Sequence, residues 1–260
     1  GQMSQLERKS IEPIALNVQS AKVRAMQHFL SDIAWEEDRI LSRYHDMVSE
    51  DLGDAEGVLI FDESGFVKKG NDSVGVARQY CGNIGKVENC QVGVYTAYAS
   101  RHGYCFLDNR LFIPEKWFGE DYVERRKKCR LPDESSFKTK PQLAAEMLEK
   151  IAGEGVIPFR YVAADSIYGN SPEFLEAIEK LSGVTYIVAL PRDTLCWLQE
   201  PAIMEKTYRY GGEKRTKRVL AETGKKPVTF EKIARGTNDY FWYRRTVSEG
   251  TKGPVTYEFM

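Results

Sequence analysis

Apolar and polar positions alternate in several separate segments between residues 58 and 113. A strand sends successive side chains to opposite faces, so this alternation predicts strands at 58–62, 73–80, 91–99 and 104–113. Turns rich in glycine and asparagine separate the first three segments, and such turns favour an antiparallel meander. The first segment is expected to run into Asp62 and then into a tight turn.

Apolar residues at helical spacing predict helices on both sides of this region. Residues 1–50 carry that spacing, and Ser20 is a candidate N-cap. Thr139 can cap a second helix over 141–151, which Gly153 and Gly155 would end. A third helix is predicted from Ser171-Pro172 to about Leu181, because proline is favoured in the first turn of a helix.

Two further apolar strands, at 159–165 and 184–190, flank the last of these helices. A strand–helix–strand unit favours parallel pairing. The predicted fold class is therefore α/β, with a mixed five-stranded sheet and flanking helices. Short, basic, strand-like pieces linked by glycine-rich turns follow, including a strand expected at 228–233, and they predict a β-rich insertion. The predicted domains are an N-terminal helical segment (1–52), the core (53–193) and the basic insertion (194–260).

Composition describes an ordinary globular protein of 260 residues, with 42% hydrophobic and 29% charged residues. The sequence contains no run of about 18 apolar residues and no signal peptide, so we expect no membrane span. Five scattered cysteines without a CxxC pair favour reduced thiols in a cytoplasmic protein. The net charge of −1 hides an acidic stretch at 31–64 and a basic one at 206–245 that could meet a phosphate backbone.

The strongest chemical signal is a pair of aspartates that each follow an apolar strand pattern. Asp62 ends Val58-Leu59-Ile60-Phe61-Asp62, and Asp165 ends Tyr161-Val162-Ala163-Ala164-Asp165. A single aspartate at a strand end is usually a turn or cap residue. Two on adjacent strands would repel each other unless a cation bridged them, and Mg²⁺ suits such carboxylates. The pair therefore predicts metal-assisted phosphoryl transfer on nucleic acid. A phosphohydrolase with an aspartate nucleophile is a weaker alternative, because position 64 is serine rather than a second acid.

Several separate segments resemble one protein family, in the same order along the chain. They include Phe61-Asp62-Glu63-Ser64-Gly65-Phe66-Val67-Lys68-Lys69-Gly70, Arg110-Leu111-Phe112-Ile113-Pro114, Thr139-Lys140-Pro141-Gln142-Leu143-Ala144, Ala164-Asp165-Ser166-Ile167-Tyr168-Gly169 and Glu249-Gly250-Thr251-Lys252-Gly253-Pro254. This wording resembles the DDE transposases of bacterial insertion sequences, and the likeness spans nearly the whole chain.

The resemblance implies an RNase H-like core that cuts and transfers DNA strands with an Asp-Asp-Glu triad. It implies two Mg²⁺ ions, with Mn²⁺ able to substitute, and matches Asp62 and Asp165 to the first two acids. The third acid of the family is a glutamate on a later helix. Glu258 has no helical pattern around it and is not assigned that role. The chain ends are expected to be those of a piece of a longer protein.

Double-stranded DNA is the implied partner, bound by a homodimer in the bacterial cytoplasm at the nucleoid. A transposase-derived DNA-binding protein without catalytic activity is the alternative. Glu63 is expected to form a salt bridge or turn contact rather than to bind metal. Tyr168 could stack on a base or pack on the sheet, and the basic residues could contact DNA or form solvated faces. The candidate DNA-binding residues are Lys68, Lys69, Arg125, Arg126, Lys127, Lys128, Tyr168, Lys214, Arg215, Lys217, Arg218, Lys225 and Lys226.

Overall fold

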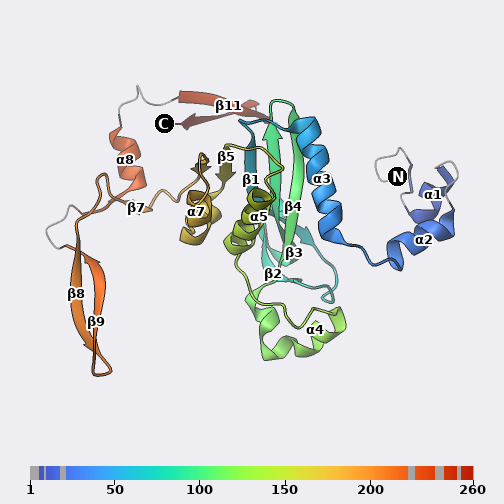
Figure 1. Ribbon diagram of the computed structural model, residues 1–260, viewed down its shortest axis with the longest axis horizontal. Coiled ribbons are helices and arrows are strands. Elements are labelled where there is room, and N and C mark those ends of the chain that lie inside the picture. The colour runs from blue at the N-terminus through green and yellow to red at the C-terminus, as the bar shows by residue number, and fades with distance from the viewer. Residues whose placement is uncertain are drawn as a thin grey trace.

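A six-stranded mixed sheet forms the centre of the fold (Figure 1). The computed structural model describes residues 6–8, 10–17, 22–221, 226–237, 243–250 and 253–259, so Ser20 and Lys225 lie outside the described residues. The strand order is β2-β3-β1-β5-β6, and β4 also pairs with β3. The strands of this sheet are β1 (Val58–Val67), β2 (Ala77–Cys81), β3 (Lys86–Ser100), β4 (Gly103–Phe112), β5 (Tyr161–Ala164) and β6 (Thr185–Val188).

The prediction of a mixed α/β sheet is confirmed, but the sheet has six strands rather than five. The antiparallel meander expected of the first three predicted strands is wrong, because β1 pairs with β3 and β2 does not lie between them. Strand β3 pairs antiparallel with β1, β2 and β4, and β5 and β6 pair in parallel beyond β1. Strand β3 is 15 residues long, and β4 pairs only with its residues 92–100. Its first five residues are left to pair with β2, which adds the sixth strand.

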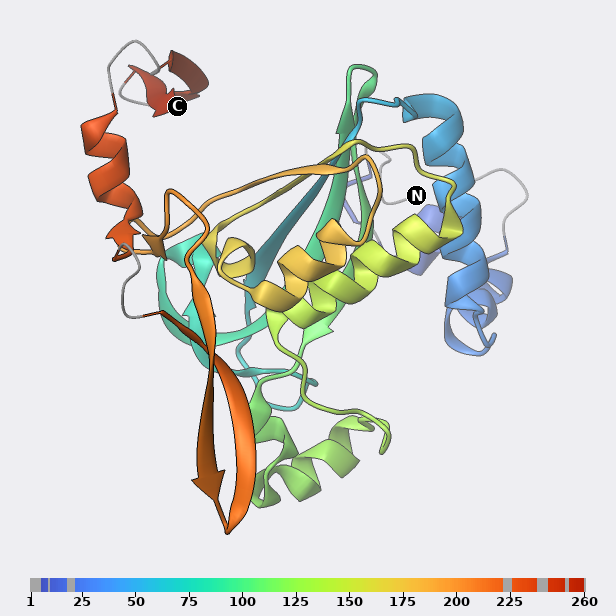
Figure 2. The same ribbon diagram turned by 60° about the vertical axis from the view of Figure 1, so that its left-hand side comes forward.

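Helices α5 (Lys140–Glu154) and α7 (Pro172–Glu179) pack side by side against one face of the sheet (Figure 2). The predicted cap is confirmed, because Thr139 and Gln142 form a reciprocal capping box at the start of α5. Apolar side chains of α5 and α7 bury those of β1, β3 and β5. The fully buried core residues there include Leu59, Phe61, Val94, Ala144, Met147, Leu148, Ile151, Val162, Phe174 and Ile178.

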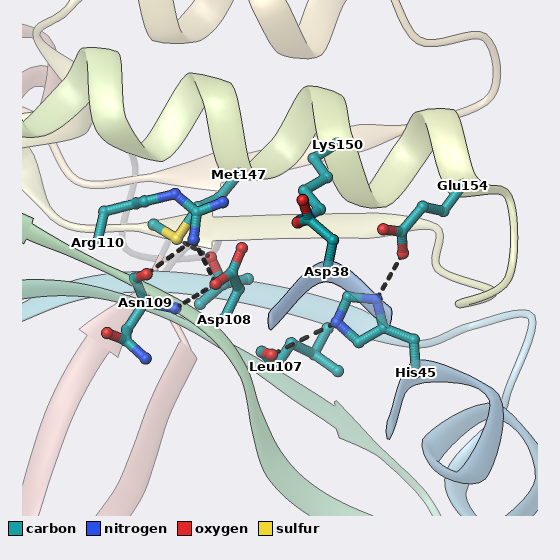
Figure 3. A network of polar contacts seen from close by, with 10 residues as sticks. Asp38, His45, Leu107, Asp108, Asn109, Arg110, Met147, Lys150 and Glu154 are labelled. Carbon is teal, nitrogen blue, oxygen red and sulfur yellow. Dashed lines mark hydrogen bonds and ion pairs between the residues drawn. The ribbon is translucent and has the colours of Figure 1, made fainter. Parts of the chain in front are cut away.

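Three helices lie in the N-terminal segment: α1 (Ile11–Asn17), α2 (Val23–Ser31) and α3 (Glu37–Leu52). Polar contacts join α3 to the sheet and to α5 (Figure 3). The buried ring of His45 lies 2.6 Å from the carboxylate of Glu154, and Lys150 pairs with Asp38 at 2.5 Å. These contacts fix α3 beside the open edge of β4. None of the helices that the structure describes has the length and apolarity that a bilayer crossing requires.

Between β4 and α5 the chain forms η2 (Glu115–Phe118), η3 (Glu120–Tyr122) and α4 (Val123–Cys129), and η1 (Gly82–Ile84) joins β2 to β3. After β6 it forms short strands and hairpins: β7 (Leu195–Cys196), β8 (Ile203–Tyr210), β9 (Glu213–Leu220), β10 (Val228–Thr229), β11 (Tyr243–Gly250) and β12 (Gly253–Phe259). The strand expected at 228–233 is wrong beyond Thr229, because the Thr229 hydroxyl caps helix α8 (Phe230–Gly236). Glu258 lies in β12, outside any helix, as predicted.

An ion pair at the turn before β1 gives the fold a predictable response to acid. Arg101 donates two hydrogen bonds to the carboxylate of Asp54, at 2.5 and 3.0 Å. These bonds, with a further one from the backbone N–H of Glu56, hold the pKa of Asp54 well below its ordinary value. A carboxylate with a lowered folded-state pKa stabilises the fold above its unfolded-state pKa, and this contribution is lost as pH falls below about 4.

We expect Asp54→Asn to flatten the acid limb of the stability curve. Urea unfolding between pH 3 and pH 7 would show the wild-type free energy of unfolding falling more steeply below pH 4 than that of the variant. Parallel curves for the two proteins would contradict the assignment.

Candidate active site

The two aspartates lie at neighbouring positions because of the register between β1 and β5. These strands pair in parallel from Val58 opposite Tyr161 to Phe61 opposite Ala164, and Asp62 and Asp165 are the next residue on each. Neighbouring strands in a sheet lie about 4.8 Å apart. The register therefore brings together the two carboxylates that the sequence singles out.

Strand β1 continues to Val67, so the tight turn expected after Asp62 is wrong. The neighbouring strand β5 stops at Ala164, so its pairing with β1 ends one residue before Asp62. Phe61 and Glu63 both contact the helix side of the sheet, where Phe61 packs on Phe174. Strand alternation therefore sends Asp62 to the opposite, exposed face.

Asp165 forms the N-cap of α6 (Ser166–Gly169), a single turn that follows β5 directly. Its Oδ1 accepts a hydrogen bond of 2.9 Å from the backbone N–H of Ile167. A cap of this kind fixes one carboxylate oxygen and leaves the other exposed to solvent. Gly169 ends the turn, and a side chain there would collide with the backbone carbonyl of Ala189. The glycine in the Asp-Ser-Ile-Tyr-Gly motif thus permits close packing of α6 on the segment after β6.

Electrostatics at this point of the sheet disfavour further negative charge. Partial burial raises the pKa of Asp62, and the nearby charges of Glu63 and Asp165 raise it further. A hydrogen bond of 2.8 Å from the backbone N–H of Glu63 and the charge of Lys140 act in the opposite direction. Burial and the same group of carboxylates raise the pKa of Tyr168 as well. A bound cation would relieve this repulsion.

The donor set fits a divalent metal in part. Asp62 and Asp165 offer carboxylate oxygens, which hard cations prefer, on an exposed face where water and phosphate oxygens can complete the coordination. Within the described ranges, no group of three or more His, Cys, Asp or Glu side chains is arranged to hold a metal. Two carboxylates alone would leave most coordination positions of a divalent cation to water, phosphate oxygens or other groups.

Glu63 forms the salt bridge that the sequence predicts. Its Oε1 lies 2.7 Å from the Nζ of Lys140, at the start of α5. Its Oε2 accepts a hydrogen bond of 2.9 Å from the hydroxyl of Tyr168. Tyr168 is fully buried, so packing on the sheet holds and stacking on a DNA base does not. The DNA contact predicted for Tyr168 is therefore wrong in this structure, because the buried ring has no face accessible to a base.

Lys68 and Lys69 follow β1 and are distant from the aspartate pair. Lys68 lies six positions after Asp62, and at about 3.3 Å per residue these positions span roughly 20 Å. The side chain of Lys68 is half-buried and that of Lys69 is exposed. A role for them at the reacting phosphate is not supported, since the extended strand carries them to the far end of the sheet.

The basic cluster on α4 is largely engaged with its own surroundings. Arg126 donates to the backbone carbonyls of Trp117 and Gly119, at 2.5 and 2.9 Å. Lys127 and Lys128 pair with Glu124 and Asp72, at 3.1 and 2.6 Å. The guanidinium of Arg125 lies 4.8 Å from the centre of the Tyr122 ring. These contacts engage the cluster within its own surroundings, and DNA contact by it stays a prediction.

Lys214, Arg215, Lys217 and Arg218 lie on the β8–β9 hairpin, which projects away from the sheet (Figure 1). Arg215 and Lys217 share one face with Tyr208 and Tyr210, and Lys214 and Arg218 lie on the other. Lys226, which precedes β10, is exposed.

Sequence reasoning missed two residues beside the aspartates. Lys140 reaches the site only through the fold, although its place in the Thr139-Lys140-Pro141 motif was a signal. Tyr95 of β3 lies directly opposite Asp62 in the antiparallel register. Directly opposed residues share a face of the sheet, so Tyr95 is beside Asp62. No local pattern marks Tyr95, because the pairing of β1 with β3 alone places it there.

The mixed sheet and its helices form an RNase H-like fold, and Asp62 and Asp165 lie where the pairing of β1 with β5 ends. A family model described as "DDE superfamily endonuclease" matches residues 1–254. The chain therefore belongs to the DDE endonuclease superfamily, a family of nuclease-type enzymes. It is 34% identical over 191 residues to a protein of Microchaete diplosiphon named "Probable transposase for insertion sequence element IS701". The match covers 73% of this chain and 46% of that relative, so it spans about half the relative's length. No solved structure matches this chain.

Proposed function

We propose that this chain carries the catalytic region of a DNA transposase that cleaves and transfers strands at the ends of an insertion sequence. The register that places Asp62 and Asp165 at neighbouring strand positions is the observation that supports this function most directly. The name of the relative, a probable transposase, points the same way. The test is metal-dependent cleavage of insertion-sequence end DNA by the complete protein, compared with variants at either aspartate.

In this proposal Asp62 and Asp165 hold Mg²⁺, as two ions for which Mn²⁺ can substitute. Divalent cations in such a site stabilise the attacking and leaving oxygens during in-line displacement at phosphorus. The protein contributes an exposed sheet face on which a DNA backbone can approach both carboxylates. The backbone N–H groups of Glu63 and Ile167 orient one oxygen of each carboxylate and leave the second oxygen for a ligand.

A transposase-derived DNA-binding protein without catalytic activity is the second candidate. It is favoured by the lack of a third metal-capable side chain beside the two aspartates within the described residues. The two candidates differ in one measurement, because only the enzyme would cleave DNA when divalent metal is added. Under both, the partner is double-stranded DNA in the bacterial cytoplasm at the nucleoid. For the transposase, joining two DNA ends calls for a homodimer.

The β8–β9 hairpin is the surface we propose for DNA contact. The side chains of β8 and β9 are exposed apart from that of Val219, which is half-buried, and a two-stranded ribbon fits the major groove of B-DNA. Its tyrosine-bearing face carries Lys206, Arg215 and Lys217 and includes a hollow of about 790 Å³ between Lys206, Tyr208 and Lys217. Cation–π contacts place Lys217 over Tyr208 and Arg215 over Tyr210, at 5.3 and 5.4 Å, and so preorganise the charges.

Neutralising the tyrosine-bearing face is expected to weaken DNA binding and its dependence on salt. The double variant Lys206→Gln/Lys217→Gln removes two cations, and each lost phosphate contact lowers the slope of log K against log salt by about 1. Fluorescence anisotropy with duplex DNA at several salt concentrations would show a slope lower by about 2. The matched control Arg209→Gln/Lys214→Gln changes the opposite face by the same charge. Equal slopes for the two double variants would contradict the assignment of the binding face.

A further inference from the structure

Three elements meet beneath the two aspartates through the side chain of Glu63. Glu63 lies in β1 directly after Asp62, Lys140 begins α5, and Tyr168 lies in α6 three residues after Asp165. One carboxylate oxygen of Glu63 is 2.7 Å from Lys140, and the other accepts the Tyr168 hydroxyl at 2.9 Å. Both oxygens are therefore engaged on the helix side of the sheet, opposite the face that carries Asp62.

These contacts are well shielded from water. The side chains of Glu63 and Lys140 are 17% and 20% exposed, and Tyr168 is fully buried. Lys140 occupies the N-terminal end of α5, where the helix dipole disfavours a cation. Its charge therefore depends on Glu63 for compensation. A shielded ion pair contributes little net stability compared with apolar packing, and in some proteins its role is to specify one conformation.

This network joins the two elements that carry the aspartates. Asp62 belongs to β1, whereas Asp165 caps the single turn α6, and backbone pairing between β1 and β5 stops one residue before both. The hydrogen bond from Tyr168 to Glu63 bridges β1 and α6 beyond that point. Lys140 in turn anchors Glu63 to α5, the longest helix against this face.

We propose that Glu63, Lys140 and Tyr168 form a brace that sets the separation of Asp62 and Asp165 and thereby the affinity of the pair for a divalent cation. The three are positioning residues and do not themselves bind the metal. The inference rests on the proposed function, in which the two aspartates hold that metal. Partners that orient metal ligands typically change metal affinity about 10- to 100-fold when they are removed.

The test is the affinity of the whole chain for Mn²⁺, measured by electron paramagnetic resonance of the free ion. Tyr168→Phe keeps the buried ring and removes only the hydroxyl, and we expect it to weaken Mn²⁺ binding about 10-fold. Tyr161→Phe is the matched control. It removes a hydroxyl that donates to Glu56 at 3.0 Å, at the other end of the paired strands. The control is expected to leave Mn²⁺ affinity unchanged.

Two further variants distinguish an effect on the position of the aspartates from an effect on the stability of the fold. Glu63→Gln keeps an acceptor for Tyr168 but removes the ion pair, so its Mn²⁺ affinity is expected between those of the wild type and Tyr168→Phe. A purely structural role would lower the melting temperature of these variants and leave the Mn²⁺ affinity of the folded protein unchanged, which would overturn the brace. Asp62→Asn serves as the reference for the site itself. If it leaves wild-type Mn²⁺ binding intact, the metal site fails and the brace fails with it; if it abolishes binding while Tyr168→Phe and Glu63→Gln bind normally, only the brace fails.

Discussion

Replacing Asp62 or Asp165 with asparagine is expected to lower metal-dependent DNA cleavage by roughly 10³-fold or more in the complete protein, if the proposed function holds. Metal ions contribute several kcal/mol of transition-state stabilisation, and about 4 kcal/mol corresponds to this factor. Asparagine removes the negative charge and keeps the size of the side chain. The change therefore reports on the carboxylate itself.

Neither substitution should damage the fold. Asparagine caps helices as well as aspartate does, so Asp165→Asn keeps the hydrogen bond to the backbone of Ile167. Ionisation of Asp62 opposes folding, because its pKa is raised in the folded state and the cost appears as pH rises above the ordinary value. Asp62→Asn removes this cost, and without metal the melting temperature should stay the same or rise slightly at pH 7.

Cleavage of labelled end DNA in Mg²⁺ measures the first effect, and fluorescence anisotropy on the same DNA should show binding largely preserved. Asp133→Asn, in an exposed loop, is the matched control and should cleave like the wild type. Cleavage retained by Asp62→Asn or Asp165→Asn would remove that aspartate from the catalytic site.

The second large effect concerns the stability of the core at Phe174, which packs beneath the two aspartates. Phe174→Ala is expected to lower the free energy of unfolding by about 3–5 kcal/mol, the usual cost of truncating a buried phenylalanine. Phe174 is fully buried, and its ring centre lies 5.2 Å from that of Phe61 and 5.6 Å from that of Tyr168. The cavity would open beside Phe61, which precedes Asp62 in β1, and beside Tyr168, which follows Asp165 in α6.

Urea unfolding followed by circular dichroism gives this free energy. Phe66→Ala is the control, because Phe66 lies in β1 but is 50% exposed, and surface changes usually stay within about 0.5 kcal/mol. A loss below about 1 kcal/mol for Phe174→Ala would mean that α7 does not anchor the core at this point.

Local chemistry in the sequence was sufficient for many elements. The capping box at Thr139, the Ser171-Pro172 helix start and the apolar strand before Asp165 depend on residues within a few positions of one another. Such contacts form whatever the rest of the chain does, so the pattern predicts them directly. The family motifs likewise identified both aspartates without any three-dimensional information.

Local patterns failed where distant parts of the chain compete for the same residues. Strand β1 runs past the turn expected after Asp62, because β3 pairs with it continuously from Val58 to Val67. The strand expected at 228–233 failed for a local reason instead: the hydroxyl of Thr229 accepts from the backbone N–H of Lys232 and caps helix α8.

By itself the sequence determined that two aspartates follow apolar strands in a DDE-type chain, because period-2 alternation and short motifs are properties of neighbouring residues. Tertiary structure alone decided that these aspartates share the end of one strand pair, and that Glu63 meets Lys140 and Tyr168, which lie 77 and 105 residues further along the chain. Strand register and helix docking bring such residues together. Both depend on the packing of the whole core rather than on local propensity.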